Sequence, residues 1–172
     1  MFLKTAITVS IFTAFAAISL PAQADKGVKC DSNGRAYIIC TSSVLKSGKL
    51  YSYGAENFST PGAAWCEGAS DRGVGQTIRL AFPSRKTLTA IEIENGYNRT
   101  PQVWKNNGRV KKVSITSNLG FVGTRTLRDT PDAQTFSVPP QKYKWLLMTI
   151  VSVYPGAKGK DTCLGVVWPD LR

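Results

Sequence analysis

Hydrophobic and polar side chains alternate along several short stretches of this chain. Within Gln76–Phe82, the apolar residues Ile78, Leu80 and Phe82 fall at every second position, and a proline follows the run. Successive side chains of a β-strand point to opposite faces, so this period of two predicts a half-buried strand.

The same alternation occurs in Thr87–Glu94, where two isoleucines face one side and two glutamates the other, and in Val110–Ser117. Tyr143–Tyr154 differs because it is apolar at most positions, and a run with little polar face predicts a central strand. Its Val, Ile, Thr and aromatic content favours a strand over a helix, the alternative that its length allows. Shorter strands are expected at Tyr37–Thr41, Lys49–Tyr53, Thr124–Leu127, Thr135–Val138 and Leu164–Trp168.

Turns rich in Gly, Pro, Asn and Asp separate these strands, with neither a heptad pattern nor an internal repeat. The connections are too short for crossover helices, so the sequence predicts an all-β fold, an antiparallel β-sandwich. Two connections, Glu56–Gly75 and Asn95–Gly108, are longer than a hairpin requires and contain aromatic residues. Long loops on a rigid β-scaffold commonly hold binding residues, so a binding site is expected there.

The first 24 residues have the organisation of a secretory signal peptide. One basic residue, Lys4, precedes an apolar stretch over residues 6–20, and the segment ends in a small-x-small pattern. This organisation predicts cleavage before Asp25. The alternative, an uncleaved anchor, is disfavoured because the apolar run is shorter than the ~20 residues that span a bilayer. We therefore expect a secreted or periplasmic protein with no transmembrane segment after cleavage.

The chain contains four cysteines, Cys30, Cys40, Cys66 and Cys163. In an exported chain they most simply form two disulfides, for which three pairings are possible. A turn-forming stretch over residues 31–34 would bring the first two sulfur atoms together and leave Cys66 to pair with Cys163. A zinc site is the alternative, but the sequence has no Cys-x-x-Cys pair and no histidine, so no metal site is expected.

The 172 residues include 22 Lys and Arg against 11 Asp and Glu, and no histidine. Histidine is the commonest general base near neutral pH, so its absence disfavours an enzyme. No cofactor is expected. The excess positive charge attracts polyanions such as acidic polysaccharides or anionic lipids, although it could also serve only to keep an exported domain soluble. No nucleic-acid-binding motif accompanies the charge, so no specific nucleic-acid partner is predicted.

Seven short segments resemble, in order, those of a known family. They are Ala64–Gly68, Gly73–Gln76, Ile91–Tyr97, Asn106–Val113, Asp129–Thr135, Val153–Gly156 and Asp161–Cys163. The family is the NAD glycohydrolase translocation type of discoidin-like domain, which has a galactose-binding fold. The resemblance covers about Thr41 to Trp168, so we expect a disulfide-linked N-terminal extension over residues 25–40 and a β-sandwich domain over residues 41–172.

The resemblance implies a discoidin-like jelly roll that recognises glycans through loops at one end, in a protein exported by a bacterium. In the toxin after which the family is named, a separate domain cleaves the dinucleotide, so the resemblance does not imply NAD hydrolysis. Many discoidin-like carbohydrate binders carry an Asp-Gly-Asn stretch before the Trp and a Glu near a structural calcium. Here those regions read Ser59–Ala63 and Gly165–Val167, so a calcium site is not carried over.

Sugar recognition requires an aromatic ring for the C–H face of a pyranose and fixed polar groups for its hydroxyls. The candidate glycan-binding residues in or beside the two long loops are Trp65, Glu67, Arg72, Tyr97, Asn98, Trp104 and Tyr154. Core packing is the alternative role for Trp65, and local capping or pairing is the alternative for Glu67. Arg109 is expected to brace a turn or to pair with an acidic residue such as Asp129.

The sequence therefore predicts a non-catalytic binding module that recognises a glycan with anionic groups, or another anionic polymer of the envelope or cell surface. A second class stays open, a structural or accessory envelope protein that docks onto a partner protein or toxin component. The same loops and basic surface would serve either role.

Overall fold

The computed structural model describes residues 29–32, 36–84 and 86–172. The signal peptide expected over residues 1–24 and its cleavage site before Asp25 lie outside this part of the chain. The elements are β1 (Lys29–Asp31), β2 (Ile38–Thr41), the 3-10 helix η1 (Ala55–Ser59), β3 (Trp65–Cys66), β4 (Thr77–Ala81), β5 (Leu88–Asn95), α1 (Pro101–Asn106), β6 (Gly108–Ser117), β7 (Gly120–Thr126), β8 (Gln134–Gln141), β9 (Trp145–Tyr154) and β10 (Thr162–Leu171).

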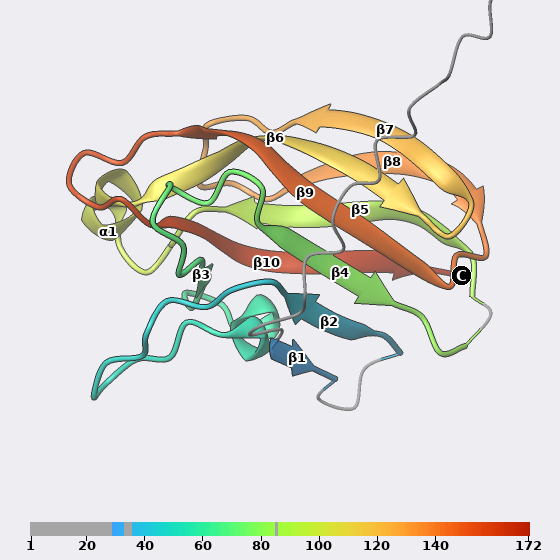
Figure 1. Ribbon diagram of the computed structural model, residues 1–172, viewed down its shortest axis with the longest axis horizontal. Coiled ribbons are helices and arrows are strands. Elements are labelled where there is room, and N and C mark those ends of the chain that lie inside the picture. Colours follow the sequence, from blue (N-terminus) through green and yellow to red (C-terminus); the bar gives the residue numbers. More distant parts are fainter. Residues whose placement is uncertain (1–28, 33–35, 85) are drawn as a thin grey trace, which may run out of the picture.

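The strands hydrogen-bond in the order β1-β2-β4-β9-β6-β10-β5-β8, with β3 beside β10 and β7 beside β6. They form a sandwich in which β4, β9 and β6 lie across from β10 and β5 (Figure 1). The two layers join where β10 pairs in parallel with β6 at Thr162 and Cys163. Every other pairing between described strands is antiparallel, so the predicted β-sandwich is confirmed with one short parallel contact.

The core lies between the layers, where the alternation in the sequence places it. Ile78 and Leu80 of β4 belong to the same buried cluster as Ile91 and Ile93 of β5. β9 is central in its layer, with β4 on one side and β6 on the other, as its nearly continuous apolar sequence predicted. Most of the predicted strands therefore form, within a few residues of the expected bounds.

Two expectations about the connecting segments were wrong. Lys49–Tyr53, predicted as a strand, is a loop, in which Leu50 is 81% exposed. Conversely, the segment Asn95–Gly108 contains the helix α1. Thr100 caps that helix by accepting a hydrogen bond from the N–H of Val103 at 3.2 Å, and a proline occupies the first turn.

Both expected disulfides form, Cys30–Cys40 and Cys66–Cys163. The first links β1 to β2, which in turn pairs with β4 and contributes the fully buried Ile39 to the core. The expected boundary between residues 25–40 and residues 41–172 therefore falls inside a strand of the sheet. Within the part of the chain that the structure describes, no helix is both long and apolar enough to cross a bilayer.

Candidate functional site

Several loops lie at one end of the sandwich, which we call the loop end (Figure 1). It is formed by α1, by residues 42–54 and by the connection from β9 to β10 over residues 155–161. The Cys66–Cys163 disulfide joins β3 to the start of β10 there. Around it is a small buried cluster of Ala64, Cys66, Tyr97 and Cys163, against which Leu45, Tyr53 and Val103 pack. The loops therefore pack on a buried cluster that a disulfide crosslinks.

Trp65 belongs to the core and not to the surface of this end. The residue is fully buried, and its ring packs against Phe58 with the ring centres 5.9 Å apart. Its indole N–H donates to the carbonyl oxygen of Ser43 at 2.8 Å, so the one polar atom of the ring is satisfied inside the protein. Trp65 therefore has no ring face free for a ligand. It has the alternative role considered for it above, which is core packing.

Glu67 is fully buried and holds backbone groups together. Its carboxylate accepts hydrogen bonds from the N–H of Thr162 at 3.1 Å and of Ala69 at 2.6 Å. Desolvation raises the pKa of this carboxyl above its ordinary value, although both hydrogen bonds oppose the shift. The Thr162 hydroxyl also donates to the carbonyl oxygen of Arg72 at 2.7 Å. Glu67 and the Arg72 backbone therefore fasten residues 66–76 to β10, while the Arg72 side chain is exposed.

Trp104 and Arg109 form a stacked pair at the base of α1. The Arg109 guanidinium lies over the Trp104 ring, 4.5 Å from its centre, and the indole N–H donates to the carbonyl oxygen of Asn95 at 2.8 Å. Arg109 also pairs with Asp129 through two hydrogen bonds of 2.7 and 3.1 Å, which confirms the expected partner. Its Nη1 donates to the carbonyl oxygen of Asn107 at 2.7 Å. Trp104 is thus half-buried in a fixed orientation, with one ring face covered.

Asn98 and Tyr154 are both half-buried and are tied to the backbone by hydrogen bonds. The Asn98 side-chain amide donates to the carbonyl oxygen of Pro131 at 2.9 Å, and the Tyr154 hydroxyl donates to that of Leu127 at 3.1 Å. The Lys111 ammonium lies 5.4 Å from the centre of the Tyr154 ring. Of the seven residues that the sequence suggested for glycan binding, some lie in the core, some hold loops in place through hydrogen bonds, and some lie on the surface. They do not form one exposed patch.

Four residues that do come together on the loop end form what we call the tyrosine–arginine cluster, Tyr51, Tyr53, Tyr97 and Arg99. The Arg99 guanidinium lies 4.1 Å from the centre of the Tyr51 ring. Hydrogen bonding to the Tyr51 hydroxyl, with a smaller contribution from Tyr97, raises the pKa of Arg99. Tyr53 packs edge-on against Tyr97 with ring centres 6.2 Å apart, and burial raises its pKa above 10.0.

Of this cluster, sequence reasoning selected only Tyr97. That residue is 8% exposed, so it supports the other members and offers little surface of its own. Tyr51 and Tyr53 were missed because their segment was interpreted as a strand. The turn-forming run at Ser47 and Gly48 was the available signal for a loop. Arg99 lay in the expected loop but was not among the selected residues.

The cluster combines a ring with a cation at an exposed position. Arg99 is exposed, and Tyr51 keeps more than a third of its surface accessible. Within the described residues Arg99 forms no ion pair with a carboxylate. A planar guanidinium can donate two parallel hydrogen bonds to a carboxylate or phosphate, and an adjacent ring can contact the C–H groups of the same ligand. The arrangement is thus chemically suited to an anionic, ring-shaped ligand.

The two-layer fold with loops gathered at one end defines a β-sandwich of the galactose-binding-like class. The chain belongs to the family described as the NAD glycohydrolase translocation F5/8 type C domain, whose model matches residues 30–168. No curated protein matches the chain.

Several solved structures share the fold. A fragment of a putative chitobiase from Bacteroides thetaiotaomicron is 16% identical, with a TM-score of 0.60 over 91% of this chain and 96% of that one. The family 32 carbohydrate-binding module of NanJ from C. perfringens, solved with galactose, is 15% identical, with a TM-score of 0.57 over 78% and 93%. The corresponding module of AlyQ, solved with 4,5-unsaturated mannuronic acid, is 16% identical, with a TM-score of 0.53 over 77% and 92%. At these identities the likeness concerns the fold.

Proposed function

We propose that this chain is an exported, non-catalytic binding module that recognises a glycan with anionic groups through its loop end. The tyrosine–arginine cluster forms the centre of the contact. Arg99 binds a carboxylate or sulfate of the glycan, and the Tyr51 ring contacts the adjacent sugar. The lysines at 46 and 49, which are exposed on the same loop as Tyr51, add attraction at longer range.

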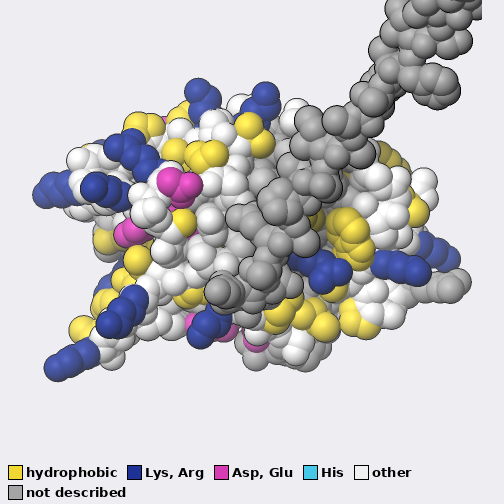
Figure 2. Space-filling model, in the orientation of Figure 1, with side chains coloured by type: hydrophobic (Ala, Val, Ile, Leu, Met, Phe, Trp, Pro, Cys, Tyr) yellow, Lys and Arg dark blue, Asp and Glu magenta, His cyan; other side chains and the backbone are white. Residues whose placement is uncertain are grey.

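The observation that carries this proposal is the exposed Arg99–Tyr51 stack, in which the charge lies within 4.1 Å of an aromatic ring. The support behind it is rigid, because Tyr97 belongs to the buried cluster around the Cys66–Cys163 disulfide. A preorganised site loses less conformational freedom on binding than a mobile one. Lys and Arg side chains also project from the same end of the molecule (Figure 2), which favours an anionic ligand.

The similar structures support a sugar as the ligand class. The NanJ module was solved with galactose, and the AlyQ module was solved with an unsaturated mannuronic acid, which carries a carboxylate. A non-catalytic role agrees with the chemistry of the loop end. Glu67 is buried and occupied by backbone N–H groups, and the chain contains no histidine to serve as a general base.

Calorimetric titration of the purified protein with mannuronate and galacturonate oligosaccharides, and with neutral galacto-oligosaccharides of equal length, tests the proposal. We expect the acidic sugars to bind more tightly, and Arg99→Gln to weaken that binding by about tenfold, because a charge-assisted pair is lost. Tyr51→Ala should weaken binding to acidic and neutral sugars alike.

Arg79→Gln is the matched control, because Arg79 also stacks on an aromatic ring, that of Trp145 at 5.5 Å, but lies in β4. This variant should bind as the wild type does. If Arg79→Gln and Arg99→Gln lose the same affinity for acidic sugars, the effect comes only from the change in net charge. If the protein binds none of the sugars, the proposal is wrong.

Docking onto a protein is the second candidate, and the exposed Leu50 beside Tyr51 favours it. An apolar side chain at a loop tip contributes more to a protein interface than to a glycan contact. Capture of one stoichiometric protein from the source organism, persisting after glycosidase treatment and abolished by Leu50→Ser, would support this role. Arg99→Gln would then have little effect.

A further inference from the structure

The two disulfides of this chain differ in exposure, although both join residues that lie directly opposite each other on antiparallel strands. Cys66 and Cys163 are 1% and 0% exposed and belong to the buried cluster at the loop end. Cys30 is exposed on β1, and its partner Cys40 is 9% exposed on β2. A disulfide reacts with a thiolate only where one of its sulfur atoms can be reached, so Cys30–Cys40 is the accessible bond of the two.

The position of β1 in the sheet determines which sulfur atom is open to attack. A thiolate approaches one sulfur atom from the side opposite the sulfur that leaves. Because β1 ends the strand order β1-β2-β4, an approach to Cys30 comes from beyond the edge of the sheet. An approach to Cys40 would come from the side of β4, where Arg79 lies opposite Cys40. The arrangement therefore favours attack at Cys30, with Cys40 as the leaving group.

The strand β1 contributes no buried side chain to the core. It has three residues, Lys29–Asp31, and within the described part of the chain it pairs with one strand, β2. A strand this short forms few ladder hydrogen bonds, and local opening begins where few apolar contacts hold the chain. Once the bond to Cys40 is broken, β1 can therefore leave the edge of the sheet. Its departure separates the two sulfur atoms, which slows re-formation of the bond.

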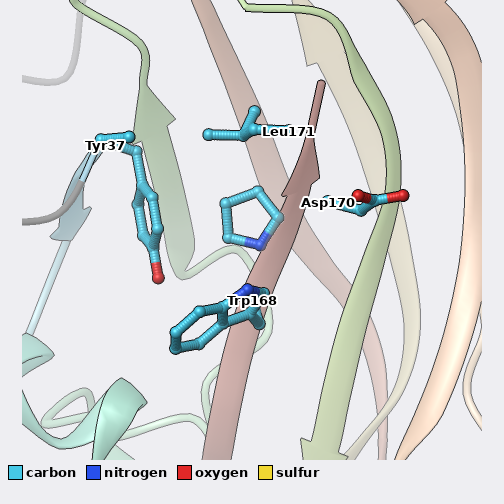
Figure 3. A pocket seen from close by; sticks show the side chains of 6 residues that line it. Tyr37, Trp168, Asp170 and Leu171 are labelled. Atoms are coloured by element: carbon cyan, nitrogen blue, oxygen red, sulfur yellow. The ribbon is translucent and has the colours of Figure 1, made fainter.

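The neighbouring strand β2 is anchored independently of β1. Its Ile39 is fully buried, and all four of its residues pair with β4. Tyr37, just before β2, is also buried and lines a pocket of about 360 Å³ together with Trp168 and Leu171 of β10 (Figure 3). The Tyr37 hydroxyl donates to the carbonyl oxygen of Val167 at 3.4 Å. Release of β1 would therefore leave the sandwich intact.

We propose that Cys30 is a site of thiol–disulfide exchange, at which the chain forms a mixed disulfide with a small thiol. The incoming thiolate attacks Sγ of Cys30, the Cys30–Cys40 bond breaks, and Cys40 leaves as a thiolate that takes up a proton. A second thiolate that attacks the mixed disulfide releases a disulfide of the small thiol and leaves Cys30 as a thiol, which completes a two-electron reduction. This inference goes beyond the proposed function, because neither cysteine belongs to the tyrosine–arginine cluster.

The test exposes the oxidised, folded protein to glutathione and stops the reaction at a series of times with N-ethylmaleimide, which alkylates every free thiol. Trypsin cleaves after Lys29, Arg35 and Lys46, so Cys30 and Cys40 fall in separate peptides. Mass spectrometry should find glutathione on Cys30 and the alkyl group on Cys40. The rate of this reaction should rise in proportion to the glutathione concentration, because the thiolate attacks the folded protein directly.

The Cys66–Cys163 bond is the control within the same molecule. Cys30–Cys40 should react about 100-fold faster, because the buried bond becomes accessible only when the cluster around it opens. In urea that unfolds the chain, the two bonds should react at similar rates. The Cys30→Ala and Cys40→Ala double variant should take up no glutathione while circular dichroism reports a folded sandwich. The proposal is overturned if both bonds react equally fast in the folded protein, if glutathione is found on Cys40, or if Cys30–Cys40 reacts only in denaturant.

Discussion

Arg109 covers one face of the Trp104 ring at 4.5 Å while its two hydrogen bonds to Asp129 anchor it to the segment that follows β7. The same guanidinium donates to the carbonyl oxygen of Asn107 at 2.7 Å and contacts that of Pro155 at 3.4 Å. One side chain therefore holds α1, the segment after β7 and the connection after β9 in register. The geometry of the loop end depends on this single planar cation.

Replacement of Arg109 by lysine should destabilise the protein although the charge is kept. Lysine cannot reproduce the two-pronged contact with Asp129 or the stack on Trp104. Loss of these charge-assisted hydrogen bonds should lower the free energy of unfolding by about 2–3 kcal/mol, measured by urea denaturation. Arg172→Lys is the control, because its ion pair with Asp170 is exposed and contributes at most about 1 kcal/mol. Equal effects of the two substitutions would contradict the proposed role of Arg109.

Gly96→Ala should disturb the stacked pair of Trp104 and Arg109. Gly96 has φ of +91°, and an added Cβ would lie 2.8 Å from Trp104 Cδ1 and from Arg109 Cγ. We expect a loss of about 2–4 kcal/mol, because strain from the positive φ adds to the steric overlap. Gly62→Ala separates the two causes, since Gly62 has φ of +74° and nothing within 4 Å of the added carbon. If both variants lose the same stability, contact with Trp104 is not the cause.

The sandwich could be predicted from the sequence because burial imposes a period that the sequence records. Strands such as Thr77–Ala81 alternate visibly, and the two disulfides were predicted from the spacing of the cysteines and from the expected export. The loop end could not be predicted in the same way. Trp65 was considered a ligand contact because it lies in a long loop, yet β3 carries it into the core. Loop conformations depend on individual hydrogen bonds, such as that from Trp65 to Ser43, which leave no periodic signal.

Trp168 shows the reverse case. Trp168 alternates with the buried Val167 along β10 and faces outward, and nothing in the local sequence indicated that Tyr37 lines the same pocket. The two residues line the same pocket although they lie far apart in the sequence. Their proximity depends on the path of the sheet, which a single sequence does not reveal.

The two disulfides should contribute unequally to stability. Cys66–Cys163 joins residues 97 positions apart, whereas Cys30–Cys40 spans only 10. On the chain-entropy model, the first should stabilise the fold by about 4–5 kcal/mol and the second by less than about 3 kcal/mol. Paired Cys→Ala variants, compared by thermal and urea unfolding, measure the difference. A larger effect from Cys30 and Cys40 would show that β1 contributes more than its short loop implies.

Loss of the Cys66–Cys163 bond should also weaken binding at the loop end before the fold is lost. The bond lies in the buried cluster that contains Tyr97, against whose ring Tyr53 of the tyrosine–arginine cluster packs edge-on. The Cys66→Ala and Cys163→Ala double variant should therefore bind acidic oligosaccharides less tightly at temperatures where circular dichroism still reports a folded sandwich. The Cys30→Ala and Cys40→Ala double variant is the control and should bind normally. If the variant without Cys66 and Cys163 binds acidic oligosaccharides as tightly as the wild type, the disulfide does not support the binding site.

Glu67 gives the stability a pH dependence of defined sign. Burial raises the pKa of its carboxyl above 4.5, so the folded chain holds the proton more tightly than the unfolded chain. The contribution of this group to the free energy of unfolding is therefore fully present below pH 4.5 and is lost as the pH rises through the folded-state pKa. Glu67→Gln removes the titration. It also leaves one of the N–H groups of Thr162 and Ala69 facing an amide nitrogen, at a cost of about 1–3 kcal/mol.

The measurement is the difference in unfolding free energy between the wild type and Glu67→Gln, determined by urea denaturation from about pH 4 to about pH 8. The advantage of the wild type should decrease as the pH rises, because only the wild type must ionise a buried carboxyl. Glu92→Gln, on the exposed side of β5, controls for the change of a carboxylate to an amide. An advantage that grows with pH would mean that the hydrogen bonds from Thr162 and Ala69 outweigh desolvation, and that this buried carboxylate is held in its charged form.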